Sequence, residues 1–179
     1  MEKKKFVAHS NPEDKFGGLL SFGSRDIILP QDAIISITLG EQFTTWKTVV
    51  NAIVSQFVMK QMKKSEGLLY AELKGHLTEG YGLTMSVWDS KSMVPFRDKG
   101  PHKFAMRFFS WVFYGGKSQA YFLTYKANGS IPSIEEAYTL VKKYGKHYNG
   151  GKLERSAKKP IFGDHIPPRE ESSKTIVRF

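Results

Sequence analysis

The segment over 81–107 constrains the fold of this chain more than any other. Its first residues alternate between apolar and small or polar side chains, which predicts a strand ending at Trp88. Pro95 comes next and cannot lie deep in a helix, because it lacks the N–H and clashes with the preceding turn. Pro101 suits the first position of a helix, so a second helical piece is predicted over 101–112. A strand must therefore lead into a helical connection that is broken once.

The other elements are predicted from the same two patterns, which are the alternation of a strand and the three-to-four-residue spacing of a helix. Three further strands are predicted over 33–39, 68–74 and 120–126, and two further helices over 44–64 and 133–145. The first of these helices has apolar residues at helical spacing, with Thr44 or Thr45 to cap it and Lys60, Lys63 and Lys64 at its end. Those apolar residues are Trp46, Val49, Val50, Ile53, Val54 and Phe57. Ser133 is the predicted cap of the last helix, with Glu135 and Glu136 in its first turn.

The order of these elements predicts an α+β fold. Strand, helix, strand, strand, helix, strand is the ferredoxin-like β-α-β-β-α-β core, here with one extra C-terminal helix. Such a core has an antiparallel sheet with both main helices on one face. In the last strand, Tyr121 and Tyr125 point to one side and Phe122 points to the other, so both faces carry large apolar groups. We expect the uncovered face to meet that of a second copy in a face-to-face homodimer.

The chain divides into three parts by pattern. Residues 1–32 contain several glycines without a sustained period and are predicted to be an N-terminal extension, and 33–148 form the domain. Residues 149–179 are rich in Gly, Lys, Pro and Ser and are predicted to be a tail. Whether this tail wraps the domain or its partner is left open.

Composition excludes several classes of protein. Of the 179 residues 40% are hydrophobic and 13% aromatic, which is typical of a globular domain. No run approaches the roughly 18 apolar residues of a membrane span, and the start has no signal-peptide pattern, so a cytoplasmic protein is expected. The absence of cysteine excludes disulfides and thiolate chemistry. The net charge of +10 is spread over separate segments without a nucleic-acid-binding motif, which favours a solvated basic surface over a polyanion-binding one.

Several short motifs carry a resemblance to a known family. They are Ser86-Val87-Trp88, Met93-x-x-Phe96, Gly100-Pro101-His102-x-x-Ala105-Met106-Arg107, Tyr121-Phe122-Leu123 and Pro132-Ser133-x-Glu135-Glu136-Ala137. Over about 34–145 the chain resembles the dimeric α/β-barrel, monooxygenase-like superfamily. The similarity is to a bacterial monooxygenase-like branch and, locally, to the C-terminal part of spheroidene monooxygenases. The resemblance implies a dimer, and either cofactor-independent or haem-dependent oxygenation, or no catalysis at all.

His102 is the candidate catalytic residue. Its imidazole can serve as a base, an acid or an iron ligand, and it lies in the first turn of a predicted helix. Gly100 allows close approach of the backbone, and the helix start offers N–H groups to an anionic or carbonyl group. Trp88 and Phe96 precede this helix. We therefore predict a ligand site beside the start of the helix that begins at Pro101.

Further residues are predicted to line the same site. Trp46 would contribute an aromatic wall, and Tyr70 and Tyr81 would contribute hydroxyl groups. Arg107 can clamp a carboxylate or form a surface ion pair with Asp98 or Glu72, and both alternatives stay open. Met106 stands where the haem-degrading relatives place a proximal histidine, and it can act as an axial ligand instead. The other histidines (His9, His76, His147 and His165) have no metal-ligand spacing, so no metal site is predicted.

Two functions remain in view. The first is a monooxygenase-like protein that binds a flat apolar or aromatic small molecule between sheet and helices. Such a protein would oxidise the molecule with or without haem, with His102 taking a proton. The second is a non-catalytic dimer that binds a ligand or an acidic partner, in which Lys142, Lys143 and Lys146 would matter more than His102.

Overall fold

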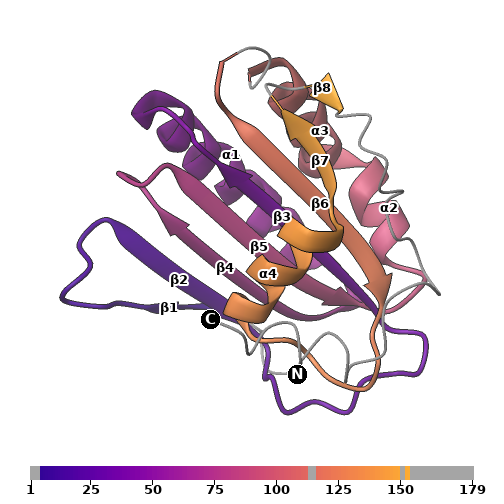
Figure 1. The fold of residues 1–179 in the computed structure, drawn as a ribbon. Helices are drawn as coiled ribbons and strands as arrows, with labels where there is room; N and C mark the ends of the chain where they lie inside the picture. Colours follow the sequence, from indigo (N-terminus) through magenta and orange to yellow (C-terminus); the bar gives the residue numbers. More distant parts are fainter. Residues whose placement is uncertain (1–4, 113–115, 150–151, 154–179) are drawn as a thin grey trace.

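The computed structural model describes residues 5–112, 116–149 and 152–153. Within them the chain forms an α+β fold (Figure 1). The strands are β1 (Phe6–His9), β2 (Gly17–Phe22), β3 (Ile34–Glu41), β4 (Leu68–His76), β5 (Tyr81–Trp88), β6 (Gln119–Lys126), β7 (Lys146–Asn149) and β8 (Lys152–Leu153). The helices are α1 (Thr45–Lys64), α2 (Met93–Asp98), α3 (Gly100–Val112) and α4 (Ile134–Tyr144). The two predicted helical pieces, one limited by Pro95 and one starting at Pro101, are thus α2 and α3, which are separated at Lys99.

The described strands form one antiparallel sheet in the order β1-β2-β4-β5-β3-β6-β7-β8. The first two strands were not predicted, because residues 1–32 lack a clear alternating pattern. Strand β2, which begins with two glycines, pairs with β4. The sheet therefore includes residues before position 33, the predicted start of the domain. At the other edge, β7 and β8 continue the sheet past β6 into the predicted tail, the rest of which lies outside the described residues.

The helices lie on both faces of the sheet. In Figure 1, α4 crosses the front of the sheet, whereas α1, α2 and α3 lie behind it. Successive side chains of a strand point to opposite faces of the sheet, so odd- and even-numbered residues contact different helices. Odd-numbered residues of β3 face α4, and even-numbered residues face α1 and α3. The same register places the odd-numbered residues of β5 and β6 on the α4 side.

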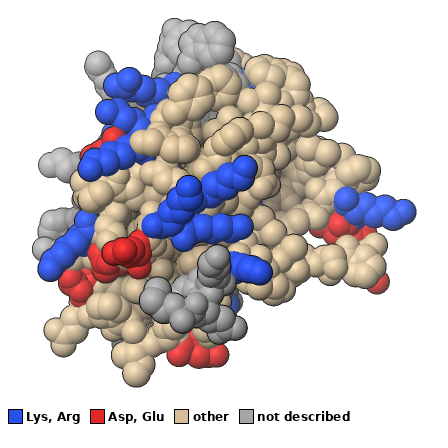
Figure 2. All heavy atoms as spheres, turned by 180° about the vertical axis from the view of Figure 1, so that it is seen from behind, with Lys and Arg blue, Asp and Glu red and all other residues tan. Residues whose placement is uncertain are grey.

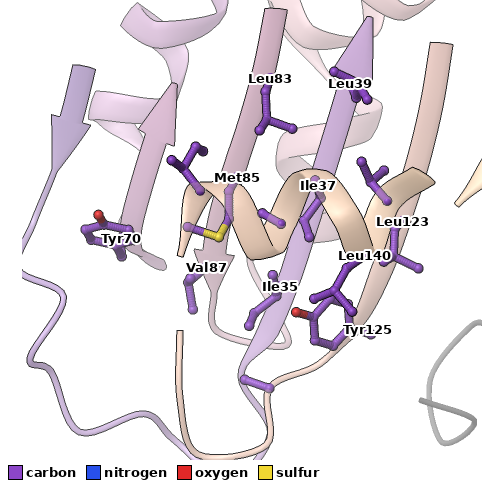
Figure 3. Packing of buried hydrophobic residues seen from close by; sticks show 14 of the residues in the cluster. Ile35, Ile37, Leu39, Tyr70, Leu83, Met85, Val87, Leu123, Tyr125 and Leu140 are labelled. Atoms are coloured by element: carbon purple, nitrogen blue, oxygen red, sulfur yellow. The ribbon is translucent and has the colours of Figure 1, made fainter. Parts of the chain in front are cut away.

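The face under α4 is a closed apolar core (Figure 3). Ile35 and Ile37 of β3 and Met85 of β5 are 0% exposed. Ala137 and Val141 of α4 are also 0% exposed, and they pack against this face. The predicted homodimer rested on an uncovered apolar face of the sheet. That face is buried within one chain, so this observation no longer argues for face-to-face dimerisation.

A smaller apolar cluster fills one end of the opposite layer. Trp88 is 1% exposed and packs with Met62 of α1 and with Met93 and Phe96 of α2. Phe22 of the unpredicted strand β2 completes the cluster. The burial of these side chains holds α1 and α2 against the end of β5.

Helix α1 turns a face to solvent that its sequence pattern does not predict. Trp46, Val49, Ile53 and Phe57 are exposed, although they form part of the predicted apolar face. Lys47, Thr48, Met59 and Met62 are buried instead. This helix is apolar around most of its circumference, so the spacing of its apolar residues does not determine which side packs inward.

The two predicted helix caps differ in the structure. Ser133 forms a full capping box with Glu136, in which each side chain bonds the other residue's backbone N–H, at 3.0 and 2.7 Å. Thr44 occupies the N-cap position of α1 but makes no side-chain capping bond. The predicted cap at Ser133 is confirmed. At Thr44 the N-cap position is confirmed, but the predicted side-chain hydrogen bond is absent.

Candidate functional site

Hydroxyl groups line the sheet face beneath α1 and α3. Two cross-strand rows form here: Ser36 of β3 lies opposite Ser86 of β5 and Thr124 of β6, and Thr38 lies opposite Thr84 and Phe122. Ser36 and Thr124 approach within 3.4 Å through their hydroxyl oxygens. We call the four hydroxyl side chains Ser36, Thr38, Thr84 and Thr124, together with Phe122 at the end of the second row, the hydroxyl floor.

The hydroxyl floor stays partly exposed, although it lies on internal strands. Its Ser and Thr side chains are half-buried, and Phe122 is 38% exposed. Ile35 and Ile37, which alternate with them on β3, are 0% exposed. The helices on this side therefore leave a part of the central sheet accessible to solvent.

Lys47 of α1 places a buried cation at one end of the layer between the sheet and helices α1 and α3. Its side chain is 8% exposed, and its Nζ donates a hydrogen bond to the Ser118 hydroxyl at 2.9 Å. Ser118 directly precedes β6, and Asn51, one turn beyond Lys47, approaches β5 at Gly82. Burying an ammonium group is costly unless polar groups compensate for its lost hydration. The Ser118 hydroxyl is one such group, and Nζ also lies 5.9 Å from the centroid of the Trp46 ring.

His102, Phe96 and Trp88 come together as predicted, but as a stack of rings. The ring centroids of Trp88 and Phe96 are 4.5 Å apart, and those of Phe96 and His102 are 4.6 Å apart. Trp88 also donates from Nε1 to Ser86 Oγ at 2.9 Å. Trp88 and Phe96 are buried, so in this structure they contribute to the core and fix the position of the histidine.

The surroundings of His102 set its protonation. Its Nδ1 lies 3.1 Å from the Arg97 carbonyl oxygen, which can only accept, so Nδ1 carries the hydrogen and Nε2 the lone pair. Burial lowers the pKa of His102 below the ordinary 6.5. The ring is therefore neutral near pH 7, as a general base or metal ligand must be.

The start of α3 already has a carbonyl group bound to it. The His102 N–H donates to Gln61 Oε1 at 2.8 Å. Gln61 Nε2 donates in turn to the carbonyl oxygens of Phe96 and Lys99, both at 3.0 Å. An amide from α1 thus occupies the place that the sequence assigned to a ligand. The contact joins residues 41 apart in the chain, which no local motif indicates.

Tyr70 lies on the opposite face of the sheet from His102. A register shift between Leu68 and Tyr70 turns Tyr70 towards the α4 side, whereas Leu68 packs with Trp88. The Tyr70 hydroxyl donates to Glu72 Oε2 at 2.9 Å, and burial together with this carboxylate raises the pKa of Tyr70 to about 12. Tyr81 stacks on His76 instead, with the ring centroids 6.3 Å apart.

The remaining predicted residues lie on the surface. Trp46 is 56% and Met106 is 42% exposed, and Arg107 is also exposed. The carboxylates considered as partners of Arg107 have other arginines: Asp98 binds Arg97 at 2.8 Å, and Glu72 binds Arg25 at 3.3 Å. The predicted site residues are therefore spread over both faces of the sheet and the outer surface.

The basic residues of the alternative function are also partly engaged. Lys142 binds Glu41 at 2.8 Å and the Tyr121 hydroxyl at 3.2 Å. This lysine is thus tied to the fold. Within the described residues, no cluster of three or more His, Cys, Asp or Glu side chains is placed to hold a metal ion.

The signal for the hydroxyl floor in the sequence is an alternation of hydroxyl and apolar side chains. Ser36 and Thr38 alternate with buried isoleucines, and Thr84 and Ser86 alternate with Met85 in the same way. Lys47 gives no comparable signal, because a lysine near the start of a helix is ordinarily exposed.

Comparison of the chain with protein-family models, with curated proteins and with solved structures gives no match. In the part of the chain that the structure describes, none of the helices combines the length and the apolar character needed to cross a membrane.

Proposed function

We propose that this chain is a ligand-binding protein with a ferredoxin-like, monooxygenase-like core. The order β4-β5-β3-β6, with α1 between β3 and β4 and with α2 and α3 between β5 and β6, supports that assignment of the fold. The ligand is a flat, largely apolar molecule with an anionic group. It binds between the hydroxyl floor and helices α1 and α3.

The partial exposure of the hydroxyl floor is the observation that carries this proposal. Internal strands covered by helices ordinarily bury apolar side chains on that face, as β3 does beneath α4. Threonine hydroxyls can donate and accept hydrogen bonds to a polar edge of a ligand. Phe122 offers a flat apolar surface at the end of the same row.

Lys47 supports the anionic part of the proposal. A cation with little exposure gains more from a bound anion than a surface lysine does, because water screens the pair less. In the complex the anionic group of the ligand lies beside the Lys47 ammonium and the Ser118 hydroxyl that Lys47 binds. The floor orients the apolar body, and its burial provides most of the affinity.

A fluorescent dye with this chemistry tests the site. We expect 1-anilinonaphthalene-8-sulfonate to bind wild type, and Thr38→Trp to abolish binding by filling the layer. Thr78→Trp, a matched substitution in the exposed turn between β4 and β5, should leave the affinity unchanged. Equal affinities of both variants would overturn the proposed site.

The uncharged analogue N-phenyl-1-naphthylamine separates the role of Lys47. Lys47→Met should weaken binding of the sulfonate about tenfold or more, since a charge-assisted hydrogen bond contributes roughly 1.5–3 kcal/mol. It should leave binding of the uncharged dye nearly unchanged. Loss of both dyes to the same extent would assign Lys47 a structural role only.

Oxidation of the ligand is the second candidate function, and the state of His102 favours it. A neutral ring with its lone pair on Nε2 can take a proton from an electron-rich substrate that reacts with oxygen. The described residues beside it do not fit haem, because Phe96 and Trp88, which were predicted to line a ligand site, are buried and stack on each other. A haem titration without any change in the Soret band, in wild type and in His102→Ala, is the expected result.

A further inference from the structure

The outer face of α1 carries an exposed apolar stripe. Trp46, Val49, Ile53 and Phe57 are 43–56% exposed. They follow one another at steps of three, four and four residues, which aligns them along one side of the helix. The stripe is about 16 Å long at 1.5 Å per residue. Large apolar side chains that are exposed in a row, and not singly, mark an interaction surface.

The stripe runs into a cluster of lysines. Lys60 and Lys64 continue its line, Lys63 lies beside it, and all three are exposed. Lys99 and Lys103 join them, because Gln61 of α1 bonds the Lys99 carbonyl and the His102 N–H at the start of α3. Figure 2, which views this side of the molecule, shows lysine and arginine side chains gathered across it.

The charge of this surface is unbalanced. Helix α1 contains no Asp or Glu among its 20 residues. On the neighbouring helix α3, Phe104 is 62% exposed beside Lys103. The surface thus presents aromatic and aliphatic groups together with an excess of cations, with Asp98 near Lys103 and Glu66 two residues beyond α1 as acidic neighbours. An occupant must accept apolar groups and supply negative charge.

We propose that this face of α1 binds an anionic lipid surface. Apolar side chains enter the boundary between headgroups and acyl chains, while the lysines reach the anionic headgroups. Trp46 at one end of the stripe has the amphipathic ring that favours this boundary. A second copy of the chain fits less well, because it brings the same excess of lysines and a further net charge of +10.

Sedimentation with vesicles tests the proposal on the full chain. Vesicles of 70% phosphatidylcholine and 30% phosphatidylglycerol should bind the protein, and pure phosphatidylcholine vesicles should bind it at least tenfold more weakly. Equal binding to both, or binding to neither, would overturn the proposal. Phe57→Ser combined with Ile53→Ser should abolish binding while the circular dichroism spectrum is preserved, because both side chains are exposed.

A charge-matched pair of variants locates the surface. Lys60→Gln with Lys64→Gln should weaken binding about 25-fold, since each lysine near an anionic surface contributes roughly fivefold in affinity. Lys15→Gln with Lys143→Gln removes the same charge from the β1–β2 turn and from α4, and should weaken binding less than threefold. Equal losses in the two double variants would show that net charge alone attracts the vesicles and would overturn the proposed surface.

Light scattering identifies the competing occupant. We expect no oligomer at micromolar concentration whose formation depends on Phe57. A dimer that dissociates in Phe57→Ser, together with failure to bind the anionic vesicles, would assign the stripe to a second copy.

Discussion

Strand β3 shows two different environments at neighbouring residues. Ile35 and Ile37 are fully buried beneath α4, whereas Ser36 and Thr38 remain partly exposed beneath α1 and α3. The α4 face is closed by apolar packing and accounts for much of the fold's stability. Among the described residues, the opposite face has its apolar cluster at the Trp88 end and carries the half-buried Ser36, Thr38, Thr84 and Thr124, with Phe122 beside them, further along. One sheet thus separates the apolar core from the face on which we propose a ligand site.

The largest effect should come from shortening a side chain on the α4 face. We expect Ile37→Ala to lower the free energy of unfolding by about 2–5 kcal/mol, because it leaves a cavity in a packed core. Thr38→Ala, at the next residue of the same strand, should cost about 0.5 kcal/mol. Urea denaturation of both variants measures the difference, and similar losses would refute the distinction between the faces.

An intermediate loss of unfolding free energy is expected at Ser86, which lies between the apolar cluster around Trp88 and the hydroxyl floor. Ser86→Ala removes the acceptor of the buried Trp88 Nε1–H, which should cost about 1–3 kcal/mol. Ser36→Ala serves as the control, because its hydroxyl contact with Thr124 is long, at 3.4 Å, and partly exposed. Unfolding free energies that fall by the same amount in both variants would argue against a closed Trp88 end.

Removal of the N-cap side chain should also destabilise the protein more at α4 than at α1. Ser133→Ala breaks the capping box of α4 and should cost about 1 kcal/mol, whereas Thr44→Ala removes no capping bond and should cost less than about 0.5 kcal/mol. Thermal denaturation of the two variants gives the ranking. A larger loss from Thr44→Ala would indicate a capping bond at α1 in solution.

The smallest effect concerns His102. Its folded pKa lies below the unfolded value near 6.5, so below pH 6.5 the unfolded chain binds the proton first. Its contribution to stability is present above pH 6.5 and is lost as the pH falls towards the folded pKa. We expect His102→Gln to flatten the decline of unfolding free energy between pH 7.5 and 5.5. A steeper decline in the variant would contradict burial of the ring.

The sequence predicts most elements of the fold because their patterns are local. The strand that ends at Trp88, the broken helix around Pro101 and the Ser133 cap each follow from a few neighbouring residues. Strand β1 escapes prediction because its four residues are too few to show a period, and β2 escapes it because it begins with two glycines and depends on pairing with distant β4. The orientation of α1 escapes it because the helix is apolar on several sides.

The candidate site depends even more on contacts between distant residues. Gln61 reaches the start of α3 from 41 residues away and takes the place predicted for a ligand group. A bulge turns Tyr70 to the other face of the sheet. Local patterns therefore predict that Trp88, Phe96 and His102 come together, but they predict neither that the rings pack on one another nor which part of the sheet face stays exposed.

Methyl NMR of the protein with 1-anilinonaphthalene-8-sulfonate tests the difference between the two faces most directly. The methyl groups of Thr38, Thr84 and Thr124 report on the hydroxyl floor, and those of Ile35 and Ile37 report on the α4 face in the same spectrum. We expect the dye to shift the three threonine signals strongly and saturably, with much smaller changes at the two isoleucines. Shifts concentrated at Ile35 and Ile37, or no saturable shift at the three threonines, would contradict the account.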